Sequence, residues 1–251
     1  MRNGLDEPPI VPMSCRICPI NRKTVCQAFE ETEFKAVQRF KIGDRVLAAG
    51  RHLYRPGETC SELYNVLDGW VALYQIVQNG RRQILDFALP GSFLGYQPDL
   101  SAALLHGAEC ITDVSVCVFP RGPFPDFVKE NPRLGDRLAV MAARDTILVH
   151  DHLTNVGCRS AQARIAYLLL TLCMRVKRNA KAHNAHPAPE VVIPLTQNYI
   201  ADALGMTSVY VSHTLRQLRE NNLLTFKGGK LQVLDPDGLA NIGDFDHLLF
   251  V

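Results

Sequence analysis

Three cysteines near the N-terminus have the spacing of a metal-binding or redox motif. Cys15, Cys18 and Cys26 follow the pattern Cys-x2-Cys-x7-Cys, which places three thiols on one short segment. Together with a fourth, distant cysteine they would supply the thiolates that hold a four-iron cluster. The same four thiolates could hold zinc, and a thiol pair beside the neighbouring basic residues could act as a redox sensor. The spacing therefore predicts thiol chemistry and leaves iron, zinc and thiol redox open.

Length and composition limit the class of protein. The chain has 251 residues and a net charge of +2, so it can form two domains, and any affinity for DNA must come from local clusters of Lys and Arg. No stretch approaches the roughly 20 apolar residues that span a membrane, which predicts a cytoplasmic protein with reduced cysteines and no membrane partner. The histidines show no metal or triad spacing, and no phosphate loop or paired carboxylates stand out, so we do not expect an enzyme.

The residues that follow the cysteines have the punctuation of an all-β domain. From about residue 45 to 119, short apolar runs alternate with turn residues at 55–58, 68–69, 79–80 and 90–91. Residues 70–77 and 83–87 flank Asn79-Gly80, which predicts a hairpin closed by a type I′ turn. Several such strands at regular spacing predict a small barrel or roll.

A long helix is predicted from about residue 133 to 156. Its apolar residues lie near an a/d rhythm, and such a narrow seam usually pairs with another helix, most simply its own copy. The alternative is that the seam packs on the barrel of the same chain. The predicted dimer interface consists of Leu134, Leu138, Met141, Asp145, Leu148 and His152.

Residues 196–220 read as a helix-turn-helix. Thr196 and Thr207 are suited to cap two helices, and Gly205 supplies the left-handed residue between them. Residues 223–226 and 231–233 flank a basic Gly-Gly tip, which predicts the wing of a winged helix. The predicted DNA-contacting residues are Ser208, Val209, Ser212, His213, Arg216, Arg219, Lys227 and Lys230.

The order of β-roll, long helix and winged helix resembles the CRP/FNR family of transcription regulators, most specifically at residues 53–58, 89–95 and 200–207. The resemblance implies an α+β fold with a mobile N-terminus and cysteine loop (1–30), a β-roll sensor domain (31–131), a dimerisation helix (132–157) and a winged helix-turn-helix domain (158–251). It also implies a cytoplasmic homodimer that binds a palindromic DNA site and has RNA polymerase as a further partner. The C-terminal residues from 235 onwards are expected to form a short helix and a docked apolar end.

The signal implied by the resemblance is oxygen rather than a cyclic nucleotide. Residues 83–120 contain no Lys or Arg, although the cyclic-nucleotide binders of the family place their phosphate-binding arginine in this interval. The oxygen-sensing FNR branch has an N-terminal cysteine trio and one cysteine before the long helix, which implies a 4Fe-4S cluster with Cys117 as the fourth ligand and Cys110 as its competitor. A regulator of this family that reads another small ligand in the roll, or a zinc or thiol sensor, is the alternative.

The recognition helix departs from the FNR branch, which carries Glu-x-x-Ser-Arg. The aligned residues here are Val209, Ser212 and His213. Valine can contact a thymine methyl group but cannot accept a hydrogen bond from a base, and histidine donates fewer hydrogen bonds than arginine. We therefore expect a DNA half-site that differs from the usual FNR sequence.

Overall fold

The computed structural model describes residues 13–181 and 191–245. The chain divides into two units, Met1–Ile76 with Leu85–Arg144, and Val77–Ile84 with Asp145–Val251. The first 12 residues of the predicted mobile N-terminus, and the predicted docked end at residues 246–251, lie outside the described residues. No helix in the described ranges is long and apolar enough to cross a membrane.

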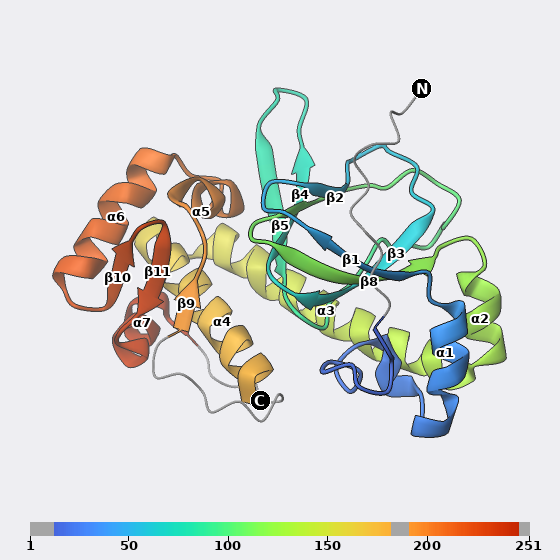
Figure 1. Cartoon of the computed structure of the whole chain (residues 1–251). Helices are drawn as coiled ribbons and strands as arrows, with labels where there is room; N and C mark the ends of the chain where they lie inside the picture. The colour runs from blue at the N-terminus through green and yellow to red at the C-terminus, as the bar shows by residue number, and fades with distance from the viewer. Residues whose placement is uncertain (1–12, 182–190, 246–251) are drawn as a thin grey trace. The chain divides into compact units, whose positions relative to one another are not determined.

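Strands β1 to β8 form two four-stranded sheets, which confirms the predicted β-roll (Figure 1). Their orders are β1-β8-β3-β6 and β2-β7-β4-β5. Apolar side chains of both sheets, including Val66, Val71 and Val116, are fully buried between them. This burial follows from the two-residue period of a strand, which sends alternate side chains inward. The strands are β1 Gly43–Leu47, β2 His52–Tyr54, β3 Glu62–Asp68, β4 Val71–Ile76, β5 Arg82–Ala88, β6 Phe93–Leu94, β7 Gly107–Cys110 and β8 Val114–Pro120.

Gly69 closes the tight connection between β3 and β4. Its φ is +90°, and a Cβ atom added there would lie 2.3 Å from the carbonyl oxygen of Asp113. Gly80, in the next turn, has a similar φ of +78° but no atom within 4 Å of the added Cβ. Comparing substitutions at these two glycines therefore separates the cost of a left-handed backbone from the cost of a steric clash.

We expect Gly69→Ala to lower the free energy of unfolding by more than Gly80→Ala. The left-handed backbone costs either alanine about 1–2 kcal/mol, and the clash at Gly69 adds a further cost of about 1 kcal/mol or more. Urea denaturation of the two variants measures the difference. Equal losses would show that the backbone near Asp113 moves aside.

The β4–β5 hairpin is confirmed, but the prediction of a two-residue type I′ turn was wrong. Such a turn needs positive φ at both central residues, and Asn79 does not have it, whereas Gly80 does. The Val77 N–H instead donates to the carbonyl of Arg81 at 3.0 Å, which closes a wider loop. The side chain of Asn79 accepts from the Arg81 N–H at 3.0 Å, an Asx-type contact that keeps its backbone at negative φ.

Short helices cover one end of the roll. The rings of Phe40 and Phe127 stack at 4.0 Å, which brings α1 against α2 (Figure 1). The apolar cluster there contains residues from the N-terminal loop, from the roll and from the first turns of α3. The elements are the 3-10 turns η1 Val25–Ala28 and η2 Glu31–Glu33, and the helices α1 Phe34–Phe40, α2 Phe124–Glu130 and α3 Pro132–Cys158.

The long helix is present, but the first half of its predicted dimer seam needs correction, whereas Asp145, Leu148 and His152 stay a prediction. Leu134 and Leu138 are buried in the cluster at the end of the roll, and Met141 packs against that cluster. These three side chains therefore serve their own chain, because the first turns of α3 close the core. Further along, Leu148 and His152 are half-buried and Asp145 is exposed. The large apolar residues of α3 that do face solvent are Val140, Ile147, Val149 and Leu153.

The second unit contains the predicted winged helix-turn-helix. Thr196 and Thr207 accept hydrogen bonds from the N–H groups of Tyr199 and Tyr210, which caps α5 and α6. Gly205 ends α5 with a φ of +65°, as predicted. α4 extends to Lys181, so the basic residues Arg175, Lys177 and Arg178 are part of a helix. The elements are α4 Ala161–Lys181, β9 Val191–Ile193, α5 Gln197–Leu204, α6 Ser208–Glu220, β10 Leu224–Lys227, β11 Lys230–Val233 and α7 Pro236–Gly243.

Candidate metal centre and nucleic-acid interface

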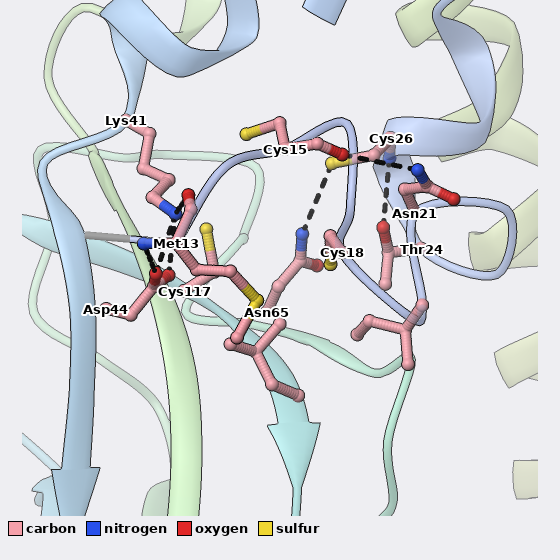
Figure 2. A pocket seen from close by; sticks show the side chains of 12 residues that line it. Met13, Cys15, Cys18, Asn21, Thr24, Cys26, Lys41, Asp44, Asn65 and Cys117 are labelled. Atoms are coloured by element: carbon pink, nitrogen blue, oxygen red, sulfur yellow. Dashed lines mark hydrogen bonds and ion pairs between the residues drawn. The ribbon is translucent and has the colours of Figure 1, made fainter. Parts of the chain in front are cut away.

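Three cysteines of the N-terminal loop and one cysteine of β8 line the same pocket (Figure 2). Cys15, Cys26 and Cys117 are buried, and Cys18 is half-buried. Cys110 is not among the lining residues, because it lies in the core between the two sheets. The full lining is Met13, Cys15, Cys18, Ile20, Asn21, Thr24, Cys26, Lys41, Asp44, Asn65, Leu67 and Cys117.

The floor of the pocket is set by strand register. Cys117 on β8 is paired with Asp44 on β1 and with Asn65 on β3. Because directly paired residues of antiparallel strands point to the same side of a sheet, these three side chains form one row beneath the loop. The amide of Asn65 reaches up to the sulfur of Cys26, with Nδ2 and Sγ 3.8 Å apart.

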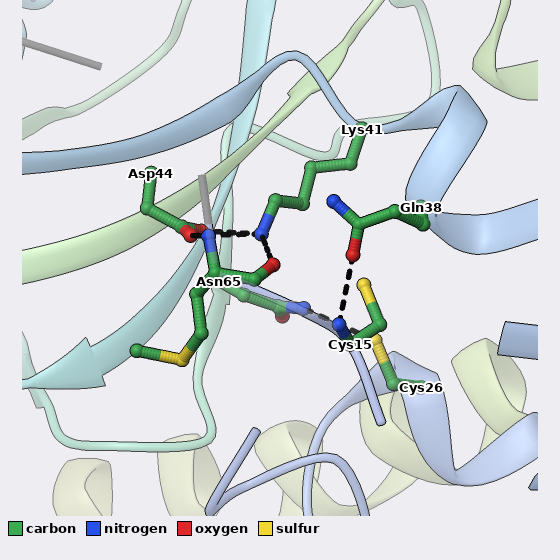
Figure 3. Close-up of polar contacts among 7 residues, drawn as sticks. Cys15, Cys26, Gln38, Lys41, Asp44 and Asn65 are labelled. Atoms are coloured by element: carbon green, nitrogen blue, oxygen red, sulfur yellow. Dashed lines mark hydrogen bonds and ion pairs between the residues drawn. The ribbon is translucent and has the colours of Figure 1, made fainter. Parts of the chain in front are cut away.

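Side chains from α1 and β1 hold the start of the cysteine loop (Figure 3). The carboxylate of Asp44 accepts from the Met13 N–H at 2.6 Å, and Lys41 Nζ donates to the Met13 carbonyl at 2.8 Å. Lys41 Nζ also lies 2.8 Å from Asp44, as a buried ion pair. Gln38 accepts from the Cys15 N–H at 2.8 Å. The backbone on both sides of Ser14 is thereby fixed.

The end of the loop is held by its own cap and by α3. Thr24 Oγ1 accepts from the Cys26 N–H at 3.1 Å. The guanidinium of Arg137 donates to the carbonyls of Lys23 and Thr24 at 3.1 Å and 3.2 Å. Arg133, one turn earlier, makes exposed ion pairs with Glu30 and Glu33. The segment that carries Cys26 is therefore attached to the long helix.

Burial sets the protonation of the four thiols. It raises the pKa of Cys15 and of Cys18, and it raises the pKa of Cys26 to about 12. The pKa of Cys117 is also raised, again mainly by burial. A reactive sensor cysteine needs a lowered pKa and an accessible sulfur, so this environment favours neutral thiols until a metal displaces their protons.

The thiols share a pocket without being closed around a single ion. Within residues 13–181 and 191–245, no three His, Cys, Asp or Glu side chains are grouped closely enough to hold one metal ion. Each thiolate of a four-iron cluster binds a different iron, so such a cluster is held by sulfurs that stand further apart than those around one zinc ion. The described lining supplies four thiols, which are the soft donors that either a four-iron cluster or one zinc ion would use.

The predicted DNA-contacting residues all lie at the surface of the second unit. Val211, Leu215 and Leu218 on α6 are buried, which turns the opposite face of this helix outward. Val209 is 77% exposed at its first turn. Arg216 pairs with Glu220 at 3.0 Å, but both are exposed, so this ion pair costs little to break. The exposed residues are Ser208, Val209, Ser212, His213, Arg216, Arg219, Lys227 and Lys230.

Sequence reasoning missed several residues of both sites. Tyr210 is 44% exposed next to Val209 on α6, and a tyrosine hydroxyl is one of the groups that contact phosphates in DNA-binding proteins. A helical projection of residues 208–220 would have shown this tyrosine. In the cysteine pocket, Lys41, Asp44 and Asn65 were missed, because only strand register brings them to the thiols.

Comparisons with known proteins agree with this two-part organisation. Residues 44–131 match the cyclic nucleotide-binding domain and residues 163–242 match the Crp-like helix-turn-helix domain. The chain is 33% identical to the nitrogen fixation regulation protein FixK of Bradyrhizobium diazoefficiens over 88% of this chain and 90% of that protein. It is 27% identical to the transcriptional activator FnrL of Cereibacter sphaeroides over 89% of each chain. The solved structure of FixK2 from Bradyrhizobium japonicum is similar with a TM-score of 0.69 and 28% identity, over 79% of this chain and 96% of that one.

Residues 83–120 contain no Lys or Arg, and the first basic residue after them is Arg121. It is 1% exposed and donates to the carbonyls of Cys60 and Asp99, at 3.1 Å and 3.4 Å. Its guanidinium thus supports the backbone of the roll. That no cyclic nucleotide binds stays a prediction.

Proposed function

This chain belongs to the CRP/FNR family of transcription regulators, and we propose that it is a DNA-binding homodimer controlled by an oxygen-labile 4Fe-4S cluster. The proposed ligands are Cys15, Cys18, Cys26 and Cys117. The observation that carries the proposal is the meeting of three loop thiols and one strand thiol in one pocket. A bound cluster would supply the sensitivity to oxygen. The residues of the chain supply the ligands, the anchors of the loop and the contact with α3.

Thiol redox is supported less well by the pocket. The raised pKa values of the four thiols disfavour the thiolate that a redox sensor needs. One zinc ion held by the same four thiols stays an alternative, which metal analysis of the purified protein decides. A member of the family that reads another small ligand in the roll is the remaining alternative.

We place the dimer contact on the exposed side of α3. Val149 and Leu153 are 58% and 65% exposed and lie four residues apart, so they form one apolar strip. Val140 and Ile147, seven residues apart, form a second strip on the opposite face of the helix, because Val140 and Val149 are about two and a half turns apart. One partner helix covers only one face, so we assign the contact with a second copy to the strip of Val149 and Leu153. Two recognition helices about one DNA turn apart would then read a palindromic site, with RNA polymerase as a further proposed partner.

A visible spectrum of protein purified without air tests the proposal. Iron–thiolate absorption that is lost on admitting air, together with iron and sulfide in the protein, is the expected result. A colourless protein that contains zinc or no metal would refute the cluster and favour the alternative ligands. Sedimentation before and after aeration would show whether the dimer depends on the cluster.

The wing is expected to contribute phosphate contacts rather than base contacts. Lys230→Gln should weaken binding to unrelated duplexes by similar factors and reduce the slope of log affinity against log salt by about one. Fluorescence anisotropy with two duplexes at several salt concentrations measures both effects. Lys35→Gln, which removes an exposed charge from α1 in the sensor unit, is the control. A loss confined to one duplex would mean that Lys230 reads sequence.

A further inference from the structure

The cysteine pocket contains one cation and one carboxylate among its described lining residues. These are Lys41 and Asp44, whose side chains are only 3% and 9% exposed. Lys41 Nζ lies 2.8 Å from both carboxylate oxygens of Asp44 (Figure 3). Asp44 is the strand partner of Cys117. The pair therefore stands beside the proposed ligands and away from the screening of bulk water.

Any metal centre built from four cysteines places a negative charge in this pocket. Four thiolates around one Zn²⁺ ion leave a net charge of two minus, and a four-iron cluster whose core is doubly positive carries the same charge. Burying such an anion is unfavourable unless a cation lies nearby. Lys41 lowers this cost, whereas the carboxylate of Asp44 raises it. Because the charges of Lys41 and Asp44 cancel, the pair as a whole leaves the free energy of burying the metal centre nearly unchanged.

We propose that Lys41 and Asp44 act in opposite directions on the charged cysteine centre, with Lys41 as the counter-ion that stabilises the metal-bound thiolates and Asp44 as the carboxylate that offsets this stabilisation. This inference rests on the proposed cysteine ligands. Asp44 has a second task, because it also accepts from the Met13 N–H. A purely mechanical role would make Lys41 and Asp44 two anchors of the loop and nothing more.

Two models predict different outcomes for three variants of the full-length protein. In the charge model, Lys41 and Asp44 act through their charges on the metal centre. In the anchoring model, they act only by holding the loop in place. Under the charge model, Lys41→Met weakens metal binding about tenfold and Asp44→Asn strengthens it by a similar factor, since a unit charge acts over several ångströms at an effective dielectric of about 20. Asparagine keeps an oxygen that can accept from Met13. The double variant removes both charges and should bind within about threefold of the parent. Under the anchoring model, every variant binds more weakly and the double variant binds most weakly.

The probe is Co²⁺ added without air to the metal-free protein, followed by its thiolate charge-transfer absorption. Where the iron cluster forms, its reduction potential should fall in Lys41→Met and rise in Asp44→Asn. Should Lys41→Met fail to fold, because it leaves a buried carboxylate unpaired, Asp44→Asn and the double variant still decide the matter. Weaker or unchanged binding in Asp44→Asn would overturn the charge model. A parent protein that binds neither Co²⁺ nor iron would instead overturn the proposed cysteine centre, and the charge model with it.

Discussion

Cys117→Ala is expected to reduce the iron content of anaerobically purified protein by more than tenfold, whereas Cys110→Ala should leave it near the parent value. Cys117 lines the pocket with the loop cysteines and faces the same side of the sheet as Asp44 and Asn65. Cys110 belongs to the core between the two sheets. A site that loses one of its four thiolates loses one of the four bonds that hold the cluster, and with it much of its affinity for the cluster. Iron and sulfide assays with visible absorption measure the outcome.

The two alanine variants are matched in their structural cost. Both sulfurs are buried, with exposed fractions of 6% and 0%, so each substitution deletes one buried group at a cost of about 1 kcal/mol. Alanine is preferable to serine because a buried hydroxyl would need a partner. Urea denaturation of the metal-free proteins checks that their stabilities are similar. Iron loss in Cys110→Ala with iron retained in Cys117→Ala would reverse the assignment.

The sequence predicted best those features that are coded locally. The caps at Thr196 and Thr207, the left-handed Gly205 and the Gly-Gly wing tip are each decided by a few neighbouring residues. The same holds for the β-roll, since alternating apolar runs and turn residues specify strands wherever the rest of the chain lies.

The sequence could not decide what covers an apolar seam. Leu134, Leu138 and Met141 have the spacing of a dimer interface, yet they close the core of their own domain. Both roles require the same apolar row on the helix, so periodicity alone cannot separate them. Only the structure shows which face of α3 packs on the roll, and therefore which of its apolar residues stay exposed to solvent.

Nor could the sequence reveal the residues that surround the thiols. Asp44 and Asn65 lie far from Cys117 in sequence and meet it through the pairing of three strands. Register of this kind depends on the whole sheet rather than on any local signal. Arg137 was missed for a related reason, because an arginine on an amphipathic helix usually lies in solvent.

Arg137→Gln is expected to weaken the effect that the state of the cysteine loop has on dimerisation. In the parent protein we expect aeration to raise the dimer dissociation constant at least tenfold. In the variant that factor should fall below about threefold, because α3 no longer holds the carbonyls of Lys23 and Thr24. Thr24 is buried and also caps Cys26, so the lost hydrogen bonds belong to the segment that carries a proposed ligand. Sedimentation velocity with and without air gives the two constants.

Arg133→Gln is the matched control for this coupling. Arg133 lies on the same side of α3 one turn earlier, but its ion pairs with Glu30 and Glu33 are exposed to solvent and contribute little to stability. The control should therefore keep the full effect of air on dimerisation. Iron content must be measured in both variants, so that altered coupling is not confused with a lost cluster. If Arg137→Gln retains both its iron and the tenfold response to air, the loop must act on α3 through the apolar contacts of Leu134 and Leu138 with the core that contains Cys15 and Cys26.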